Sequence, residues 1–162
     1  MRLRKLQMKD GPLMLEWMRD EPVVRYFRKD FASQTIDDCS DFISNAQNET
    51  ENIHLAIADD QDEYMGTVSL KQIRQNTAEL GIALRAAAMG RGYALFGMNE
   101  IIEYGYRERG INDIYWCVDP ENQRAVRFYD GSGYRRCGIP AQAVGYTKEE
   151  KQKYLWYHVQ HL

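Results

Sequence analysis

The sequence contains no uninterrupted apolar run of the roughly 18 residues that a membrane helix needs, because charged or amide side chains interrupt every stretch. Its first six residues are basic but alternate with apolar side chains, and no apolar segment of about 7–15 residues follows them. We therefore expect no membrane partner and no export signal, which favours a cytoplasmic location.

Cysteine is rare, and positive charge is not in excess. Cys39, Cys117 and Cys137 are odd in number and widely spaced, which fits free thiols in a reducing compartment and no Cys-x-x-Cys metal site. The three histidines show no ligand spacing, so we expect no metal. With 21 Lys and Arg against 24 Asp and Glu, the net charge is -3, and no basic field exists to bind nucleic acid.

Proline and glycine are too few for a disordered or collagen-like chain, at 4 and 12 residues. Hydrophobic residues make up 44% and charged residues 28%, as is usual for globular proteins. The length fits a single domain, residues 1–162.

Hydrophobic periodicity changes along the chain between the strand period and the helix period. It predicts helices over 13–18, 36–46, 94–105 and 122–129, and strands over 2–5, 53–58, 65–70, 78–84, 113–118, 134–137 and 154–159. Hairpins pair antiparallel, whereas a strand, helix and strand crossover pairs in parallel. The predicted fold is α/β (α+β), with a single mixed, twisted, mostly antiparallel sheet of about seven strands flanked by about four helices.

A glycine-containing turn stands between the strand at 78–84 and the helix at 94–105. Gly90 and Gly92 allow a tight turn, and the helix start adds free N–H donors with a partial positive charge, so the place suits an anion such as pyrophosphate. The turn lacks the Gly-Lys-Ser/Thr ending of a nucleoside-triphosphate loop, and Leu95 stands where a dinucleotide fingerprint has its third glycine. A plain strand-to-helix turn is the alternative.

A second signal follows the strand at 113–118. Asn122 and Tyr129 lie seven residues apart, two turns along one side of a helix, and both can face one cleft. The alternative is a capping asparagine with a half-buried core tyrosine.

Three segments together resemble the GNAT superfamily of acetyl-CoA-dependent N-acetyltransferases: Glu79-Leu80-Gly81-Ile82, Met89-Gly90-Arg91-Gly92-Tyr93-Ala94, and Asn122 through Tyr129 followed by Gly133-Tyr134. Leu3-Arg4-Lys5-Leu6 with Asp10 is similar to the family's first strand and helix, so the resemblance covers nearly the whole chain. It is closest to the branch that acetylates ribosomal-protein N-termini and small amines. The implied reaction moves acetyl from acetyl-CoA to a primary amine of a small molecule, an amino sugar among them, or to a peptide N-terminus, by direct attack in a ternary complex.

The resemblance also implies the cosubstrate site. The family's pyrophosphate loop falls on Met89, Gly90, Arg91, Gly92, Tyr93 and Ala94. Met89 replaces the usual polar side chain, so binding would depend on backbone N–H groups. Ile82, Ala83 and Leu84 would pair with the pantetheine arm as an added strand does, and Asn122 would contact the cosubstrate.

The resemblance implies that Tyr129 is the general acid. A phenol suits this role, because with a pKa of about 10 it stays protonated at neutral pH and can protonate a leaving thiolate. A backbone N–H near Ala83 or Leu84 would polarise the thioester carbonyl. The family's frequent glutamate, five positions before the asparagine, is here Cys117. We therefore predict Glu79 as the base, acting directly or through water, with a structural carboxylate as the alternative.

Three further hypotheses remain open at the level of sequence. In the first, Cys117 carries the acetyl group as a thioester. In the second, the chain is a catalytically silent acyl-CoA-binding module, because Met89 replaces the family's usual polar side chain and Cys117 its frequent glutamate. The glycine turn alone would also suit a dinucleotide-binding fold. The last strand, with Tyr154, Trp156 and Tyr157, offers a surface for a homodimer.

Overall fold

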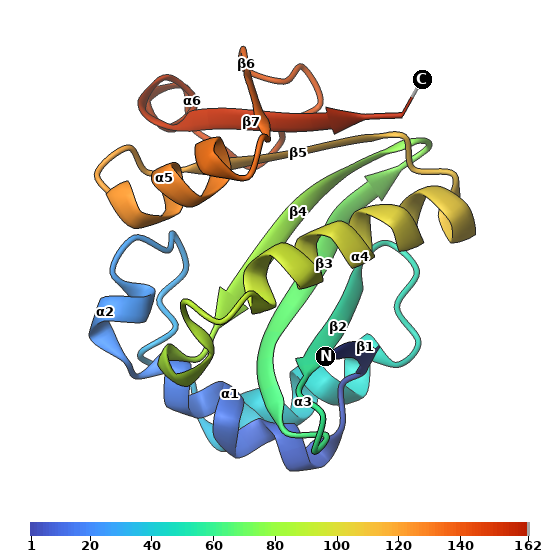
Figure 1. Cartoon of the computed structure of the whole chain (residues 1–162), viewed down its shortest axis with the longest axis vertical. Helices are drawn as coiled ribbons and strands as arrows, with labels where there is room; N and C mark the ends of the chain where they lie inside the picture. The colour runs from blue at the N-terminus through green and yellow to red at the C-terminus, as the bar shows by residue number, and fades with distance from the viewer. Residues whose placement is uncertain (162) are drawn as a thin grey trace.

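The computed structural model describes residues 1–161 and shows a seven-stranded sheet in the order β1-β2-β3-β4-β5-β7-β6 (Figure 1). The strands are β1 (Arg2–Lys5), β2 (Ile53–Ala58), β3 (Tyr64–Arg74), β4 (Thr77–Leu84), β5 (Asp113–Val118), β6 (Arg135–Cys137) and β7 (Leu155–Gln160). All neighbouring pairs are antiparallel except β4 and β5. The predicted mixed, mostly antiparallel sheet is confirmed.

Six α-helices accompany the sheet within residues 1–161, where we expected about four. They are α1 (Gly11–Met18), α2 (Glu21–Val24), α3 (Ile36–Ala46), α4 (Tyr93–Arg109), α5 (Gln123–Gly131) and α6 (Lys148–Lys153), with short 3-10 turns η1 (Met8–Asp10) and η2 (Ala86–Ala88). The two unexpected helices, α2 and α6, span 4 and 6 residues, too few to show a helical period. Only the capping box of Thr147 with Glu150 marks α6 in the sequence.

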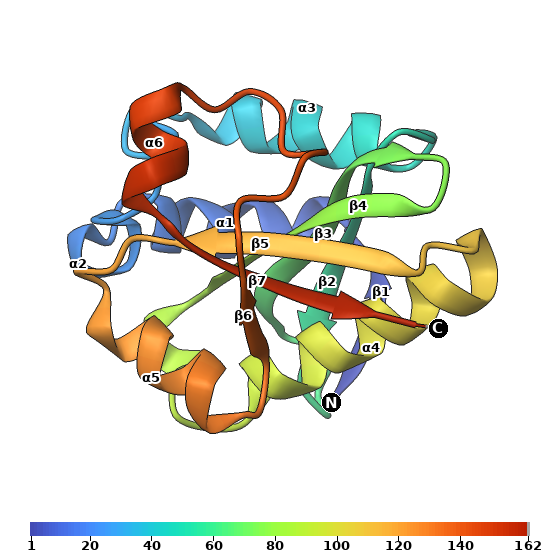
Figure 2. The ribbon, with the colours of Figure 1, turned by 90° about the horizontal axis from the view of Figure 1, so that it is seen from above.

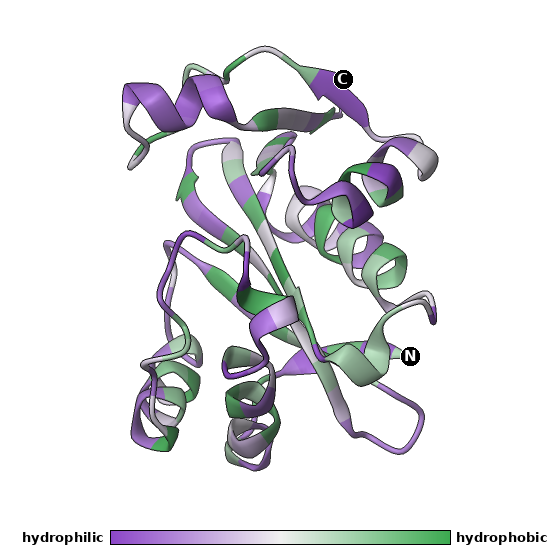
Figure 3. Cartoon of the chain, turned by 90° about the vertical axis from the view of Figure 1, so that its left-hand side faces the viewer, coloured by the Kyte–Doolittle hydropathy of each residue, from purple (hydrophilic) through white to green (hydrophobic). Residues whose placement is uncertain are grey.

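The helices lie on both faces of the sheet. Figure 2 shows α1 and α3 on one face and α4 and α5 on the other. Each face has its own apolar core: Met14, Trp17 and Ile43 belong to the first, and Met98 and Ile101 to the second. The side chains of β4 alternate between these cores, with Leu80 and its even-numbered neighbours on the α4 face and Ala83 on the α1 face. Figure 3 shows green apolar and purple polar residues mixed along the strands of the sheet.

The parallel pair β4 and β5 is short. Its register covers only residues 77–79 against 113–115, although β4 continues to Leu84 and β5 to Val118. Beyond Glu79 the two strands diverge, as Figure 1 shows. This opening in the sheet positions the site described below.

The homodimer surface that we expected on β7 is largely unavailable. Trp156 is 3% exposed and Tyr157 is 0% exposed, because both pack inside the chain. No helix within residues 1–161 has the length and hydropathy needed to cross a membrane.

Candidate functional site

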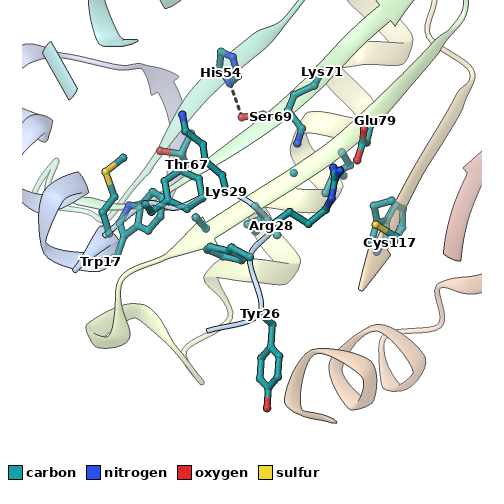
Figure 4. Close-up of a pocket in the computed structure, with 18 of the residues that line it drawn as sticks. Trp17, Tyr26, Arg28, Lys29, His54, Thr67, Ser69, Lys71, Glu79 and Cys117 are labelled. Carbon is teal, nitrogen blue, oxygen red and sulfur yellow. Dashed lines mark hydrogen bonds between the residues drawn. The ribbon is translucent and has the colours of Figure 1, made fainter. Parts of the chain in front are cut away.

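A cavity of about 630 Å³ opens where β4 and β5 diverge. Its walls come from α1, β2, β3, β4, β5, α5 and the segment from Tyr26 to Asn45, together with Tyr146 and Tyr154. Figure 4 shows part of this lining, with Trp17, His54 and Glu79 among the labelled side chains. The cavity reaches both faces of the sheet, because Trp116 and Tyr129 belong to the core under α4 and Trp17 to the core under α1. A ligand in this opening therefore passes through the sheet.

The edge of β4 beyond Glu79 is open to the cavity. Arg85 donates its backbone N–H to the carbonyl oxygen of Met65 in β3 at 3.0 Å. Along a strand, the main-chain N–H and C=O groups of successive residues point to alternate sides. Ile82 and Leu84 therefore direct their N–H and C=O groups toward the gap, where β5 no longer pairs with them. Ala83 directs its main chain to β3 and its side chain into the cavity.

Tyr129 lies on α5, where its ring lines the cavity and is 8% exposed. Four aromatic rings surround it, those of Trp116, Phe128, Tyr134 and Tyr157, with centroids between 5.1 and 6.4 Å away. Its hydroxyl forms no hydrogen bond within residues 1–161. Burial raises the pKa of Tyr129 above its ordinary value, so the phenol keeps its proton at neutral pH.

Asn122 has the capping role that the sequence left open. Its side-chain oxygen accepts a hydrogen bond from Ala125 N at 3.3 Å, which places it at the N-terminus of α5. The residue also lines the cavity, so its amide group is on the same side as Tyr129. One helix brings both residues to the cavity.

Glu79 lies on the other face of the sheet from Tyr129, and the gap in the sheet brings both to one cavity. Its side chain is buried, at 5% exposure, and accepts a hydrogen bond from the hydroxyl of Tyr146. That hydroxyl also accepts from the thiol of Cys117 at 3.4 Å. No motif in the sequence marks Tyr146, which stands in a loop 67 residues from Glu79.

Cys117 has the environment of an unreactive thiol. Burial raises its pKa to about 11, and the hydrogen bond with Tyr146 offsets only part of this effect. Little thiolate exists at neutral pH, which argues against a covalent acetyl-cysteine.

Met89–Ala94 lies outside the lining of the cavity, between η2 and α4 at the C-terminal end of β4. Gly90 and Gly92 have φ angles of 74° and 87°, which only glycine adopts without strain. The N–H groups of residues 90–95 have no acceptor within residues 1–161, since the first bond in this helix runs from Phe96 to Gly92. Gly90, Arg91 and Gly92 are exposed, so these donors are free to hold an anion.

Arg28 fixes the segment between α2 and α3 over the cavity. Its guanidinium pairs with Glu150 at 2.7 Å, donates to Gly145 O at 2.8 Å and stacks on the ring of Tyr146 at 4.0 Å. This ion pair lowers the pKa of Glu150 to about 2, and it joins α6 to the wall of the cavity. In Figure 4, Arg28 and Glu79 point toward the same part of the cavity.

Residues 1–161 contain no group of three or more His, Cys, Asp and Glu side chains that could hold a metal ion. His54, in Figure 4, makes a hydrogen bond with the hydroxyl of Ser69 at 2.7 Å. Burial lowers the pKa of His54, so it is neutral at pH 7.

Comparison with known proteins gives consistent matches. Residues 1–135 match the family model of the acetyltransferase (GNAT) domain. An uncharacterised N-acetyltransferase of Bacillus subtilis, YnaD, is 24% identical over 155 residues, which are 95% of this chain and 90% of the relative. Another, p20 of Bacillus licheniformis, is 25% identical over 145 residues, or 85% of this chain and 80% of the relative.

Solved structures show the same fold. The spermidine N-acetyltransferase of Vibrio cholerae, in complex with CoA and spermine, superposes with a TM-score of 0.80 at 19% identity, over 98% of this chain and 94% of that one. A GNAT acetyltransferase of Bacillus anthracis gives a TM-score of 0.75 at 21% identity, over 98% and 93%. The resemblance, the enzyme class and acetyl-CoA as cosubstrate are thus confirmed, and this chain belongs to the GNAT family of acetyltransferases.

Proposed function

We propose that the chain acetylates the primary amine of a small molecule or of a peptide N-terminus by direct attack in a ternary complex. The observation that carries this proposal is the cavity through the sheet, which brings together the phenol of Tyr129, the open edge of β4 and the carboxylate of Glu79. An acid, a set of fixed N–H donors and a base are the three groups that amide formation from a thioester requires.

The residues around α4 fit the cosubstrate. The free N–H groups of residues 90–95 and the dipole of a 17-residue helix would hold the diphosphate, so the apolar side chain of Met89 is compatible with binding. The outward N–H and C=O groups of Ile82 and Leu84 would pair with the pantetheine amides. Acetyl-CoA, when bound, supplies the acetyl group as an activated thioester.

Tyr129 would act as the general acid. Its hydroxyl has no protein partner to compete for the proton, and its raised pKa keeps that proton in place until a stronger base is formed beside it. A leaving thiolate is such a base. The surrounding aromatic rings fix the phenol and exclude water from it.

Glu79 would take the proton of the amine, directly or through a water molecule. The hydroxyl of Tyr146 fixes one of its carboxylate oxygens and leaves the other to accept a proton or a hydrogen bond. Amines are mostly protonated at pH 7, so a base in the cavity is needed to give the neutral nucleophile. Because the thiol of Cys117 is partly buried, with its pKa raised to about 11, direct attack by the amine is favoured over a route through an acetylated cysteine.

Small amines are the acceptors that the matches favour. The Vibrio cholerae neighbour is named for spermidine and was solved with spermine, and nothing in the matches reported above favours an amino sugar. That residues 1–162 form one catalytic domain, which acts in the cytoplasm and pairs with a second copy, also stays a prediction.

The test is thiol release from acetyl-CoA in the presence of separate amines: polyamines, amino acids, peptides with free N-termini and amino sugars. We expect release with at least one class. Tight calorimetric binding of CoA with no release across the whole panel would overturn the proposal in favour of a silent acyl-CoA-binding module. A melting temperature raised by NAD and not by CoA would instead favour a dinucleotide-binding protein.

A further inference from the structure

Lys71 occupies an unusual place in the cavity. It is the cross-strand partner of Glu79 between β3 and β4, so the two side chains lie on the same face of the sheet. The side chain of Lys71 runs over Gly81: a Cβ at position 81 would stand 3.1 Å from its Cε and 3.2 Å from its Nζ. The missing side chain of Gly81 is what makes room for the ammonium.

This ammonium has no partner within residues 1–161. It forms neither an ion pair nor a hydrogen bond there, although Lys71 is only partly exposed. In Figure 4 the nitrogen of Lys71 points into the cavity, toward Arg28 and Glu79. A half-buried charge without a partner is costly, and an anionic ligand is the partner that would offset the cost.

A second cavity, of about 480 Å³, lies beside the first. It shares Arg28, Lys71, Glu79 and Tyr146 with the first cavity and adds Arg74 and Glu51 to its walls. Arg28 is already paired with Glu150, and Glu79 already accepts a hydrogen bond from Tyr146. Lys71 is therefore the cation shared by the two cavities whose charge no carboxylate within residues 1–161 pairs with.

The other acids of the first cavity lie away from Lys71 or have partners. Asp38 accepts from the backbone of Thr35 at 2.8 Å within the capping box of α3, and Asp119 pairs with Lys153 at 3.2 Å. Asp41 is exposed on α3. The cavity thus has acidic side chains on α3 and the ammonium of Lys71 over Gly81.

We propose that the acceptor is an amine that also carries an anionic group, a carboxylate or a phosphate, which Lys71 binds while Glu79 receives the proton of the amine. This inference rests on the proposed function and specifies its substrate class. Residues 79 and 81 are about 6.6 Å apart along the strand, so a compact acceptor can reach both Glu79 and the ammonium over Gly81. The polyamine named for the Vibrio cholerae neighbour has no such anion.

Matched pairs of acceptors test this inference. L-lysine and cadaverine differ by one carboxylate, and phosphoethanolamine and ethanolamine differ by one phosphate. We expect kcat/KM to be about 10- to 100-fold higher for the anionic member of at least one pair, as a charge-assisted contact predicts. Equal values, or preference for the member without the anionic group in both pairs, would overturn the inference and leave the proposed function intact.

The variant Lys71→Met removes the charge and keeps the length of the side chain. It should remove the preference for the anionic member of each pair, and Lys5→Met, on the far strand β1, is the matched control that should keep the preference. A Lys71→Met variant that loses both activities equally would contradict anion binding.

Calorimetry separates the two proposals when no amine is acetylated. Lysine that binds the CoA-loaded chain more tightly than cadaverine, with the difference lost in Lys71→Met, would support anion recognition in a chain that lacks the proposed activity. Equal binding of both would overturn the inference as well.

Discussion

The α4 side of the sheet and the side of α2 and α3 offer different groups to a ligand. On the α4 side the free groups are main-chain amides, those of residues 90–95, which lie outside the cavity lining, and those of the open edge of β4. On the side of α2 and α3 they are side chains, such as Arg28, Lys71 and Tyr146, from segments distant in sequence. The first side is fixed by local backbone geometry, and the second depends on how distant segments pack.

This difference explains a division of labour. A ligand held by main-chain amides is insensitive to most substitutions, because every residue except proline supplies the same N–H group. A ligand held by side chains changes with each substitution. The α4 side thus suits a cosubstrate common to a family, and the opposite side suits acceptors that differ from one member to the next.

The largest expected effect is at the junction of the two sides. Tyr129→Phe should lower kcat about 100- to 1000-fold, because the general acid is lost, while the affinity for CoA stays unchanged by calorimetry. Tyr134→Phe is the matched control: its hydroxyl donates to Asn99 at 2.7 Å outside the cavity lining, so its loss should cost less than about threefold. Undiminished turnover in Tyr129→Phe would remove this residue from the mechanism.

A second pair of variants tests the main-chain side. Gly92→Ala strains a residue with a φ of 87°, which shifts the free N–H groups and should weaken CoA binding about 30-fold. Gly110→Ala strains the opposite end of α4, at a φ of 64°. It should lower the melting temperature about as much as Gly92→Ala does, without changing CoA affinity. Equal CoA affinities in the two variants would mean that this loop does not bind the cosubstrate.

A third variant tests the side-chain half. Tyr146→Phe removes the hydrogen bond to Glu79 and keeps the ring that stacks on Arg28, so kcat/KM for the acceptor should fall about tenfold. Steady-state kinetics with varied acceptor measure this, and CoA affinity should not change. A loss of CoA affinity instead would show that the two sides are not separable.

The smallest effect is expected at Cys117. Because its pKa is raised to about 11, the thiolate is scarce at every pH below that value, so alkylation by iodoacetamide at pH 8 should be slow and should accelerate toward pH 11. Cys117→Ser should keep activity within about twofold. Loss of activity, with an acetylated chain seen by mass spectrometry in the unmutated protein, would restore the covalent route.

The sequence predicted the sheet and four of the helices, because the hydrophobic period that marks them is local. The prediction for the α4 side of the site rests on signals that are equally local, the turn glycines and the spacing of Asn122 and Tyr129. Tyr146 and Lys71 could not be predicted in the same way. Their roles arise from contacts across 67 residues in one case, and from a strand register that places an ammonium over a glycine in the other.

The short ladder between β4 and β5 has a mechanical consequence. With register pairs only at 77–79, the sheet consists of two halves joined by a narrow seam and by the apolar core beneath it. A pantetheine chain bound along β4 would form hydrogen bonds with the edge of β4 that β5 leaves unpaired, and would so connect the two halves of the sheet. Ligand binding and the rigidity of the whole sheet are then one event, so hydrogen exchange in β5 and β7, far from the diphosphate, should slow when CoA binds.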